Sequence, residues 1–182
     1  LGEEVSASSS PTTIRQADGI ILPGVGAFGS AMDELKKRRL NQVLYEEAKA
    51  GKPLLGICLG MQLLFDESDE FGVHEGLHLI PGRVEEFPKD IDLLVPQMGW
   101  NQNVVNNEQS IFADVLDGSY TYFVHSYYAK CDQQYVVSYT NYGVKVPSCV
   151  EFKNVYGMQF HPEKSGEKGL EMLERFIERV DE

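Results

Sequence analysis

The stretch Gly56-Ile57-Cys58-Leu59-Gly60-Met61-Gln62 constrains the fold more than any other part of the chain. It follows the apolar run Pro53-Leu54-Leu55 and precedes Leu63-Leu64-Phe65, a pattern that predicts a strand, a sharp turn and a helix. Such a turn places Cys58 at a helix N-terminus, where unpaired N–H groups favour a thiolate over a thiol. The flanking glycines lack a Cβ, so a substrate can approach the sulfur closely. The pattern predicts a cysteine nucleophile, and a buried structural cysteine is an equally weighted alternative.

Length, charge and cysteine content exclude several classes of protein. The 182 residues, 42% of them hydrophobic, suit a single domain over residues 1–182. A net charge of −12 argues against binding to nucleic acid or to an anionic membrane. No apolar run approaches the ~20 residues of a membrane span, and no signal peptide is visible. Three cysteines without a C-x-x-C pair favour a reducing cytoplasm and predict no structural metal site.

The first residues suggest that an α/β domain has begun upstream. The chain opens on Leu1 and Gly2, which resemble the end of a helix, and it lacks an initiator methionine. An α/β domain ordinarily starts with a strand and its helix. We therefore expect the native protein to include an N-terminal strand and helix before residue 1.

Strands and helices alternate in the first part of the chain. Residues 17–22 and 53–57 are predicted strands, and the first of them ends at Pro23-Gly24-Val25-Gly26. Residues 30–40, with an S-x-x-D start, and residues 41–50, with Asn41 as the cap and Gly51 as the stop, are predicted helices. This alternation predicts a parallel, doubly wound sheet with helices on both faces.

The chain becomes rich in β segments from His74 onward. Strands are predicted at 77–80, 83–87, 93–98, 120–126, 135–140, 146–152 and 155–160, with hairpin turns at 141–143 and 153–154. A closing helix over 166–180 carries Leu170, Leu173, Phe176, Ile177 and Val180 on one face. The predicted fold is a three-layer α/β domain with a mostly parallel central sheet, flanking helices and an antiparallel β extension.

His161 is the best-placed base for Cys58 among the four histidines. It follows the predicted strand 155–160, and parallel α/β sheets carry their active sites beyond the carboxyl ends of the strands. Pro162 disfavours a helix at His161, and in an extended chain Glu163 lies on the same side as His161. A carboxylate there can orient the imidazole, as the third member of a triad does. Taken singly, His161 can be interpreted as an ordinary strand-end histidine and Glu163 as a solvated charge.

Acyl transfer also needs donors for an oxyanion. The backbone N–H of Leu59 is one candidate. The loop at Gly24 and Val25, which ends the neighbouring strand, is another, with a plain strand-to-helix turn as the alternative. No GxGxxG or Walker loop is present, so the sequence offers no nucleotide site.

Several motifs together resemble the class I (triad) glutamine amidotransferases. The two signatures are Gly56 to Gln62 and His161-Pro162-Glu163. Other segments resemble, within this family, the glutaminase subunits of imidazole glycerol phosphate synthase from histidine biosynthesis. They are Leu22-Pro23-Gly24-Val25-Gly26-Ala27-Phe28, Pro96-Gln97-Met98-Gly99-Trp100-Asn101, Phe123-Val124-His125-Ser126-Tyr127-Tyr128 and Phe160-His161-Pro162-Glu163-Lys164-Ser165. The likeness extends over essentially the whole chain. This sequence departs from the family at Gln97, where the family often has His, and in the missing first strand.

The resemblance implies a role for each matching residue. Cys58 would attack the side-chain amide of glutamine, His161 would move the proton and Glu163 would orient His161. Water would then hydrolyse a γ-glutamyl thioester to glutamate, without a cofactor. The oxyanion loop at Gly24 and Val25 would require reorientation by the partner. The resemblance also implies a binding site for the glutamine head group, formed by Gly26, Gln62, Glu70, Ser126 and Tyr127.

The resemblance also implies a partner that accepts ammonia. A glutaminase of this length has no room for a synthase domain, and free hydrolysis would waste glutamine. The implied partner is the (β/α)₈-barrel cyclase subunit, which forms imidazole glycerol phosphate and an aminoimidazole carboxamide ribotide. The only tryptophan has two interpretations, an exposed interface anchor or a core residue. The residues implied at the interface are Met98, Trp100, Asn101, Tyr122 and Lys164.

Three other functions fit the same residues. One is the glutaminase subunit of another class I amidotransferase, and a second is a γ-glutamyl hydrolase or cysteine peptidase on the same fold. The third is a binding subunit without catalytic activity. Labelling of Cys58 by an electrophilic glutamine analogue would distinguish the last of these from the others.

Overall fold

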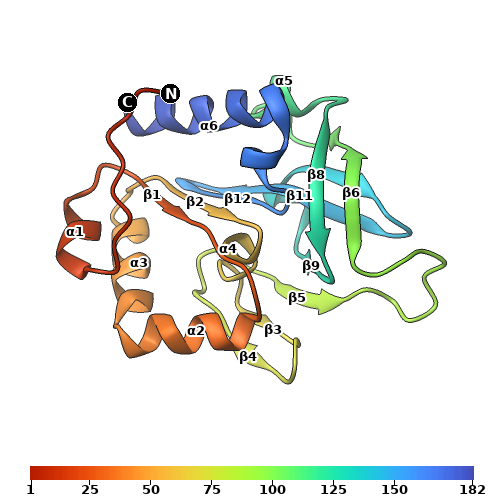
Figure 1. Ribbon diagram of the computed structural model, residues 1–182, viewed down its shortest axis with the longest axis horizontal. Coiled ribbons are helices and arrows are strands. Elements are labelled where there is room, and N and C mark those ends of the chain that lie inside the picture. Colours follow the sequence, from red (N-terminus) through yellow and green to blue (C-terminus); the bar gives the residue numbers. More distant parts are fainter.

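A mixed sheet runs through the middle of the molecule in the computed structural model, which describes residues 1–182 (Figure 1). The sheet has six strands in the order β1-β2-β12-β11-β10-β7. The first three strands are parallel and the other three are added antiparallel. The bounds are β1 Ile20–Leu22, β2 Leu54–Ile57, β12 Val155–Met158, β11 Lys145–Phe152, β10 Val136–Asn141 and β7 Val104–Val105.

Helices cover both faces of this sheet (Figure 1). One side holds α2 (Phe28–Lys37), α3 (Leu40–Lys49) and α4 (Leu59–Gln62), and the other holds α5 (Ala113–Leu116) and α6 (Gly166–Val180). Neighbouring residues of β2 point to opposite faces, since Leu54 packs in the core with α2 and Leu55 packs in the core with α6. The short helix α1 (Pro11–Gln16) lies against α3. The predicted three-layer α/β fold is confirmed.

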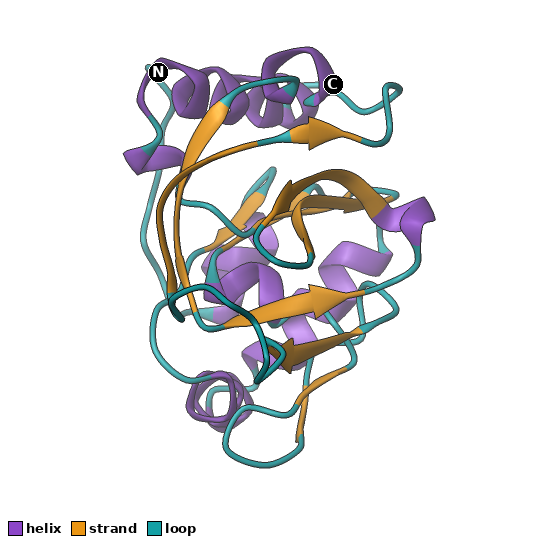
Figure 2. Cartoon of the chain, turned by 90° about the vertical axis from the view of Figure 1, so that its right-hand side faces the viewer, coloured by secondary structure: helices purple, strands orange, loops and turns teal.

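Two smaller sheets form the predicted β extension, which is antiparallel except for the parallel pair of β3 and β5. One has the order β4-β3-β5-β9, and the other pairs β6 with β8. Figure 2 shows these strands on the side of the molecule that is turned towards the viewer. Their bounds are β3 Glu67–Ser68, β4 His74–Glu75, β5 Arg83–Glu86, β6 Gln97–Gln102, β8 Tyr120–His125 and β9 Tyr127–Lys130. Two 3₁₀ turns, Gln133–Tyr135 and Pro162–Lys164, complete the elements.

The predicted hairpins and the closing helix are confirmed, but two predicted strands are not. Residues 77–80 form no strand, although they are largely buried. Their backbone instead bonds to the turn after α4, for example from the N–H of Leu77 to the carbonyl of Leu63 at 2.8 Å. Residues 93–96 form an exposed loop, and the strand β6 begins only at Gln97.

The start of α2 differs from the sequence prediction. The helix begins at Phe28 rather than Ser30, and its N-cap residue Ala27 supplies no side-chain hydrogen bond. The carboxylate of Glu70 accepts the N–H of Phe28 at 2.7 Å instead. A helix N-terminus needs an acceptor for its free N–H groups, and here a residue distant in sequence provides it. Asn41 lies inside α3, so it is not the cap of that helix.

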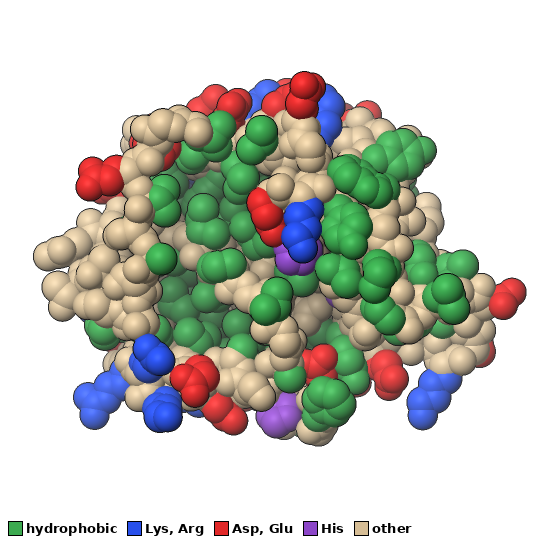
Figure 3. Space-filling model, viewed as in Figure 1, with side chains coloured by type: hydrophobic (Ala, Val, Ile, Leu, Met, Phe, Trp, Pro, Cys, Tyr) green, Lys and Arg blue, Asp and Glu red, His purple; other side chains and the backbone are tan.

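The strand β1 lies at one edge of the central sheet. Ile20 is buried, but the side chain of Ile21 is 48% exposed, so the strand is only partly the buried strand that the sequence predicts. Figure 3 shows a hollow lined by hydrophobic side chains on this side of the molecule. None of the helices has the length and apolar character that crossing a bilayer would require.

Candidate active site

Cys58 stands at a sharp turn between β2 and α4. Its backbone has φ of 56° and ψ of −113°, a conformation that a residue other than glycine adopts only when its surroundings enforce it. Its N–H donates to the carbonyl of Met158 on β12 at 2.7 Å. Glycine is required beside it, because a Cβ on Gly60 would lie 1.8 Å from the carbonyl oxygen of Leu22. The predicted strand, turn and helix are therefore present, with a helix of only one turn.

The thiol of Cys58 is more buried than the sequence suggested. Its residue is 8% exposed, and burial raises the pKa of the thiol above its ordinary value. The N–H of Leu59 acts in the opposite direction, as does the charge of Lys164, whereas Glu163 raises this pKa further. The expectation of a thiolate favoured by the helix N-terminus is wrong for the isolated chain. The four-residue helix α4 and one N–H do not compensate for the loss of water around the sulfur.

His161 and Glu163 form the predicted pair. Nδ1 of His161 lies 2.6 Å from Oε1 of Glu163, and His161 is buried whereas the Glu163 side chain is about half-exposed. A carboxylate accepts the Nδ1 proton, so Nε2 of a neutral imidazole is left to act as a base. The hydroxyl of Ser165 donates to the His161 carbonyl at 2.6 Å and holds the chain just after β12.

The sulfur of Cys58 makes its hydrogen bonds to groups other than His161 in this structure. Sγ lies 3.9 Å from the carbonyl oxygen of Val124 and 3.9 Å from Nε2 of Gln159. Catalytic hydrogen bonds are often long or absent before substrate binds, so this geometry is compatible with a cysteine–histidine pair.

The predicted oxyanion loop lies against the turn at Cys58. A Cβ on Gly24 would meet the Cβ of Leu59 at 3.4 Å and the nitrogen of Gly60 at 3.5 Å. Val25 is 82% exposed at the tip of the loop. Gly26 follows with φ of +99°, in the region that favours glycine. The fold therefore brings Gly24, Val25 and Leu59 to the same corner, as an oxyanion site would require.

Several of the residues implied in glutamine binding already make hydrogen bonds within the protein. Gln62 is buried, and its amide nitrogen donates to the Tyr127 carbonyl and to Oε1 of Gln159, each at 3.0 Å. Only its oxygen remains for a substrate. The carboxylate of Glu70 is bonded to the start of α2. The pKa of Tyr127 is raised by burial and, to a smaller extent, by the charges of Glu86 and Glu70. Ser126 forms the bend between β8 and β9.

The sequence reasoning did not single out Gln159. It lies between β12 and His161, it is completely buried, and its amide contacts both Gln62 and the sulfur of Cys58. The signal in the sequence was its position in the predicted strand 155–160, just before the predicted base, because an amide that becomes buried there requires hydrogen-bond partners.

Four of the residues implied at the partner interface, Met98, Trp100, Tyr122 and Lys164, lie on or beside the exposed face of β6 and β8, whereas Asn101 lies on the opposite face with Gln97. Met98 is 62% exposed and Trp100 is 53% exposed, so the core interpretation of the tryptophan is wrong. Trp100 pairs across the two strands with Tyr122, and their ring centroids are 6.1 Å apart. Lys164 Nζ lies 6.0 Å from the Tyr122 ring, and the part-exposed Asn101 follows on β6. Hydrophobic side chains gather over β6 and β8 in Figure 3.

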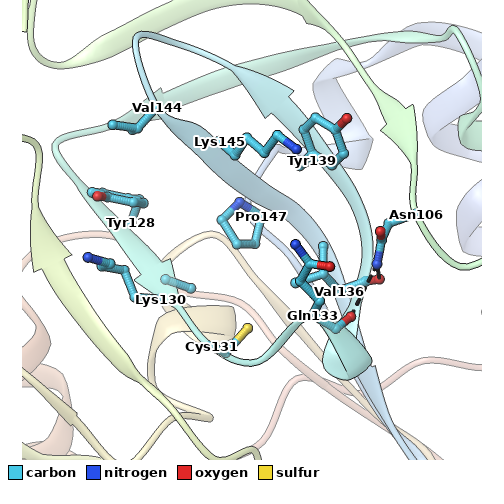
Figure 4. A pocket seen from close by; sticks show the side chains of 11 residues that line it. Asn106, Tyr128, Lys130, Cys131, Gln133, Val136, Tyr139, Val144, Lys145 and Pro147 are labelled. Atoms are coloured by element: carbon cyan, nitrogen blue, oxygen red, sulfur yellow. Dashed lines mark hydrogen bonds between the residues drawn. The ribbon is translucent and has the colours of Figure 1, made fainter.

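A cavity of about 340 Å³ lies elsewhere, between β9, β10 and β11 (Figure 4). Tyr128, Cys131 and Lys145 are among its lining residues, and none of the predicted site residues is. Burial raises the pKa of Cys131 to about 12, so this thiol stays protonated and is a poor nucleophile. Of the three cysteines, only Cys58 lies at a turn from a strand into an α-helix.

Comparison with known proteins identifies the family. The family model described as "Glutamine amidotransferase class-I" matches residues 4–180. The "Imidazole glycerol phosphate synthase subunit HisH" of Lactiplantibacillus plantarum is 55% identical over 173 residues, covering 95% of this chain and 83% of that protein. The protein of the same name from Listeria monocytogenes is 51% identical over 178 residues, covering 98% and 85%. A crystal structure of a glutamine amidotransferase has the same fold, with a TM-score of 0.75 at 17% identity and coverage of 100% of this chain and 88% of that chain. The chain thus belongs to the class I glutamine amidotransferases and, within them, to the HisH subunits of imidazole glycerol phosphate synthase.

Proposed function

We propose that Cys58, His161 and Glu163 carry out the glutaminase reaction of this HisH subunit. The chain is the glutaminase subunit of an imidazole glycerol phosphate synthase, an enzyme of histidine biosynthesis. It converts glutamine to glutamate and ammonia. The observation that carries the residue assignment is the 2.6 Å contact between His161 and Glu163, on the side of the sheet where Cys58 stands at a strained turn.

The first half of the reaction transfers the γ-glutamyl group to sulfur. His161 Nε2 accepts the thiol proton as the sulfur of Cys58 attacks the amide carbon, and a C–S bond forms. This proton transfer is necessary because burial keeps the thiol protonated in the isolated chain. The negative oxygen is stabilised by the N–H of Leu59 and by the Gly24–Val25 loop. The C–N bond then breaks, and His161 returns the proton to the leaving nitrogen, which departs as ammonia.

The second half releases glutamate. A water molecule attacks the thioester while His161 accepts one of its protons, and the C–S bond breaks to restore the Cys58 thiol. In both halves the Glu163 carboxylate accepts the Nδ1 proton of His161 and stabilises the imidazolium. We assign the amino-acid head group to Gly26, Gln62, Glu70, Ser126 and Tyr127, on the likeness to the family, and the charge of Glu70 suits an α-ammonium.

The triad is tested by three substitutions measured in the complex with the cyclase subunit. Cys58→Ala should lower glutamate formation by roughly 10⁴-fold or more. Glu163→Gln should lower kcat by roughly 10- to 100-fold, less than in a fully buried triad, because Glu163 is half-exposed and water replaces part of its effect. Glu167→Gln, in the exposed first turn of α6, is the matched control and should leave kcat unchanged. Substantial activity in Cys58→Ala would contradict the mechanism.

The ammonia passes to the cyclase subunit, with which this chain forms the synthase. We place the contact on Met98, Trp100, Tyr122 and Lys164, with Asn101 beside them on β6, because this aromatic and exposed face has the composition of an interface centre. Trp100→Ala should weaken the complex by about 2 kcal/mol, or roughly 30-fold in Kd, measured by calorimetry. Tyr45→Ala, on the remote helix α3, is an aromatic control that should leave Kd unchanged. An unchanged Kd for Trp100→Ala would place the interface elsewhere.

We further propose that residues 1–182 act as one domain in the cytoplasm. The two hydrophobic clusters pack on the two faces of one sheet, which supports a single unit. The cytoplasmic location is supported by the thiols of Cys58, Cys131 and Cys149, all of which are free.

A further inference from the structure

A row of polar side chains crosses the interior between the exposed face of β6 and the sulfur of Cys58. Its members contain amide or imidazole groups and come from separate parts of the chain. Gln62, Gln97, His125 and Gln159 are buried, and Asn101, next to Trp100 on β6, is partly exposed. Buried amides are costly unless their hydrogen bonds are made, so such a row needs an explanation.

The end of the row near β6 is formed by three side chains. The terminal amide of Gln97, which is completely buried, lies 2.9 Å from Nε2 of His125. Nε2 of the same Gln97 amide lies 3.0 Å from Oδ1 of Asn101. Gln97 therefore bridges Asn101, the neighbour of Trp100 on β6, and a histidine in the core.

The proton on His125 determines which way these amides point. Nδ1 of His125 lies 2.7 Å from the carbonyl oxygen of Tyr127, which can only accept, so Nδ1 carries the proton. Burial lowers the pKa of His125 to about 4, and the ring is neutral near pH 7. Nε2 must then accept, so the terminal amides of Gln97 and Asn101 are each turned by about 180° from their placed orientation, in which Gln97 Oε1 faces His125 and Gln97 Nε2 faces Asn101 Oδ1. Gln97 then presents its NH₂ group to His125 and its oxygen to the NH₂ group of Asn101.

The end of the row near the active site begins at the Tyr127 carbonyl. This oxygen also accepts an N–H of Gln62 at 3.0 Å, and the second N–H of Gln62 goes to Oε1 of Gln159 at 3.0 Å. The NH₂ group of Gln159 is thereby turned towards Sγ of Cys58, 3.9 Å away. A thiolate is a much better acceptor than a thiol, so this N–H stabilises the charged form.

We propose that Asn101, Gln97, His125, Gln62 and Gln159 form a positioning relay that connects the partner face to the Cys58 thiol. The side-chain amides and the His125 ring are held by matched donors and acceptors, and the Tyr127 carbonyl, which accepts from both His125 and Gln62, joins the two ends of the relay. Docking of the partner on β6 fixes Asn101 and, through the relay, the Gln159 amide that faces the sulfur. The proposal deepens the function proposed above and rests on it.

The relay is tested on the complex with the cyclase subunit, using Gln97 as the central link. Leucine at position 97 keeps the volume but neither donates nor accepts, whereas histidine can do both. Gln97→Leu should lower the partner-stimulated kcat and the rate of Cys58 alkylation by iodoacetamide by about tenfold, the effect of losing one hydrogen bond to a charged group. KM for glutamine and Kd for the partner should each stay within about twofold, and Gln97→His should restore most of kcat.

Matched variants separate the possible outcomes. Gln102→Leu removes an amide of the same strand that bonds to the Gly118 carbonyl outside the relay, and it should leave kcat unchanged. If Gln97→Leu does not fold, Asn101→Leu at a saturating partner concentration should show the same loss of kcat. A folded Gln97→Leu complex with unchanged kcat and alkylation would overturn the relay, provided that Cys58→Ala is inactive in the same assay. An active Cys58→Ala would instead overturn the underlying mechanism.

Discussion

The turn at Cys58 should not tolerate a methyl group at position 60. Gly60 lies in α4 with a backbone conformation that alanine adopts readily, so the substitution Gly60→Ala has no conformational penalty of its own. The added Cβ would lie 1.8 Å from the Leu22 carbonyl oxygen and 2.8 Å from its carbon, whereas ordinary contacts begin at 3.4 Å. Both groups are backbone, so α4 and the end of β1 must separate.

The structure gives the expected size of this effect. Overpacking in a rigid core costs about 1–3 kcal/mol, and a clash with backbone belongs at the upper end, so we expect a loss of about 3 kcal/mol in the free energy of unfolding. For a chain of this size the corresponding fall in Tm is roughly 6–12 °C. Glutaminase activity should fall even below Tm, because Leu22 leads directly into the Pro23–Gly24 loop.

Gly24→Ala is the matched control, at the other side of the same contact. Its Cβ would meet the Leu59 Cβ at 3.4 Å and the Gly60 nitrogen at 3.5 Å, which are ordinary distances. We expect a change in unfolding free energy within about 0.5 kcal/mol. Guanidinium chloride unfolding followed by circular dichroism measures both variants. Equal stabilities for Gly60→Ala and Gly24→Ala would refute the steric reasoning.

Three further predictions concern buried groups. In the native chain the Tyr122 N–H donates to the Ser165 hydroxyl at 3.0 Å, and Ser165→Ala removes this acceptor, so the free energy of unfolding in urea should fall by about 1–3 kcal/mol. The His161 carbonyl also loses its donor, so kcat should fall in part. A change in unfolding free energy below about 0.5 kcal/mol would contradict this. His125 has a folded pKa of about 4, below its unfolded value of about 6.5, so the stability that it contributes is present above pH 6.5 and is lost as the pH falls to 4. The difference in unfolding free energy between the native chain and His125→Asn should therefore decrease by about 3 kcal/mol from pH 7 to pH 4, and a pH-independent difference would show that His125 is not neutral. Phe176→Ala should cost about 3–5 kcal/mol in unfolding free energy, because Phe176 is 2% exposed between α6 and the sheet; a loss below 1 kcal/mol would mean that this core is loosely packed.

Elements governed by local chain geometry were predictable from the sequence. The closing helix was predicted with the bounds that α6 has, because its apolar residues recur at helical spacing. His161 and Glu163 were predicted to lie side by side, because two residues of extended chain place them so. The details of packing were less predictable: Leu170 of the predicted apolar face is 49% exposed, and Met172 is completely buried. Which positions are covered depends on α5 and β8, which pack against α6.

The sequence by itself determined the family, the cysteine turn with its glycines and the histidine–glutamate pair, since each is written in a few adjacent residues. The tertiary structure alone decided the protonation of Cys58, because its pKa depends on how much water the surrounding elements exclude. It also decided that Glu70 caps α2 and that Gln159 faces the sulfur. These contacts join residues far apart in the chain, and hydrogen bonds of this kind follow from the packing of elements rather than from local sequence.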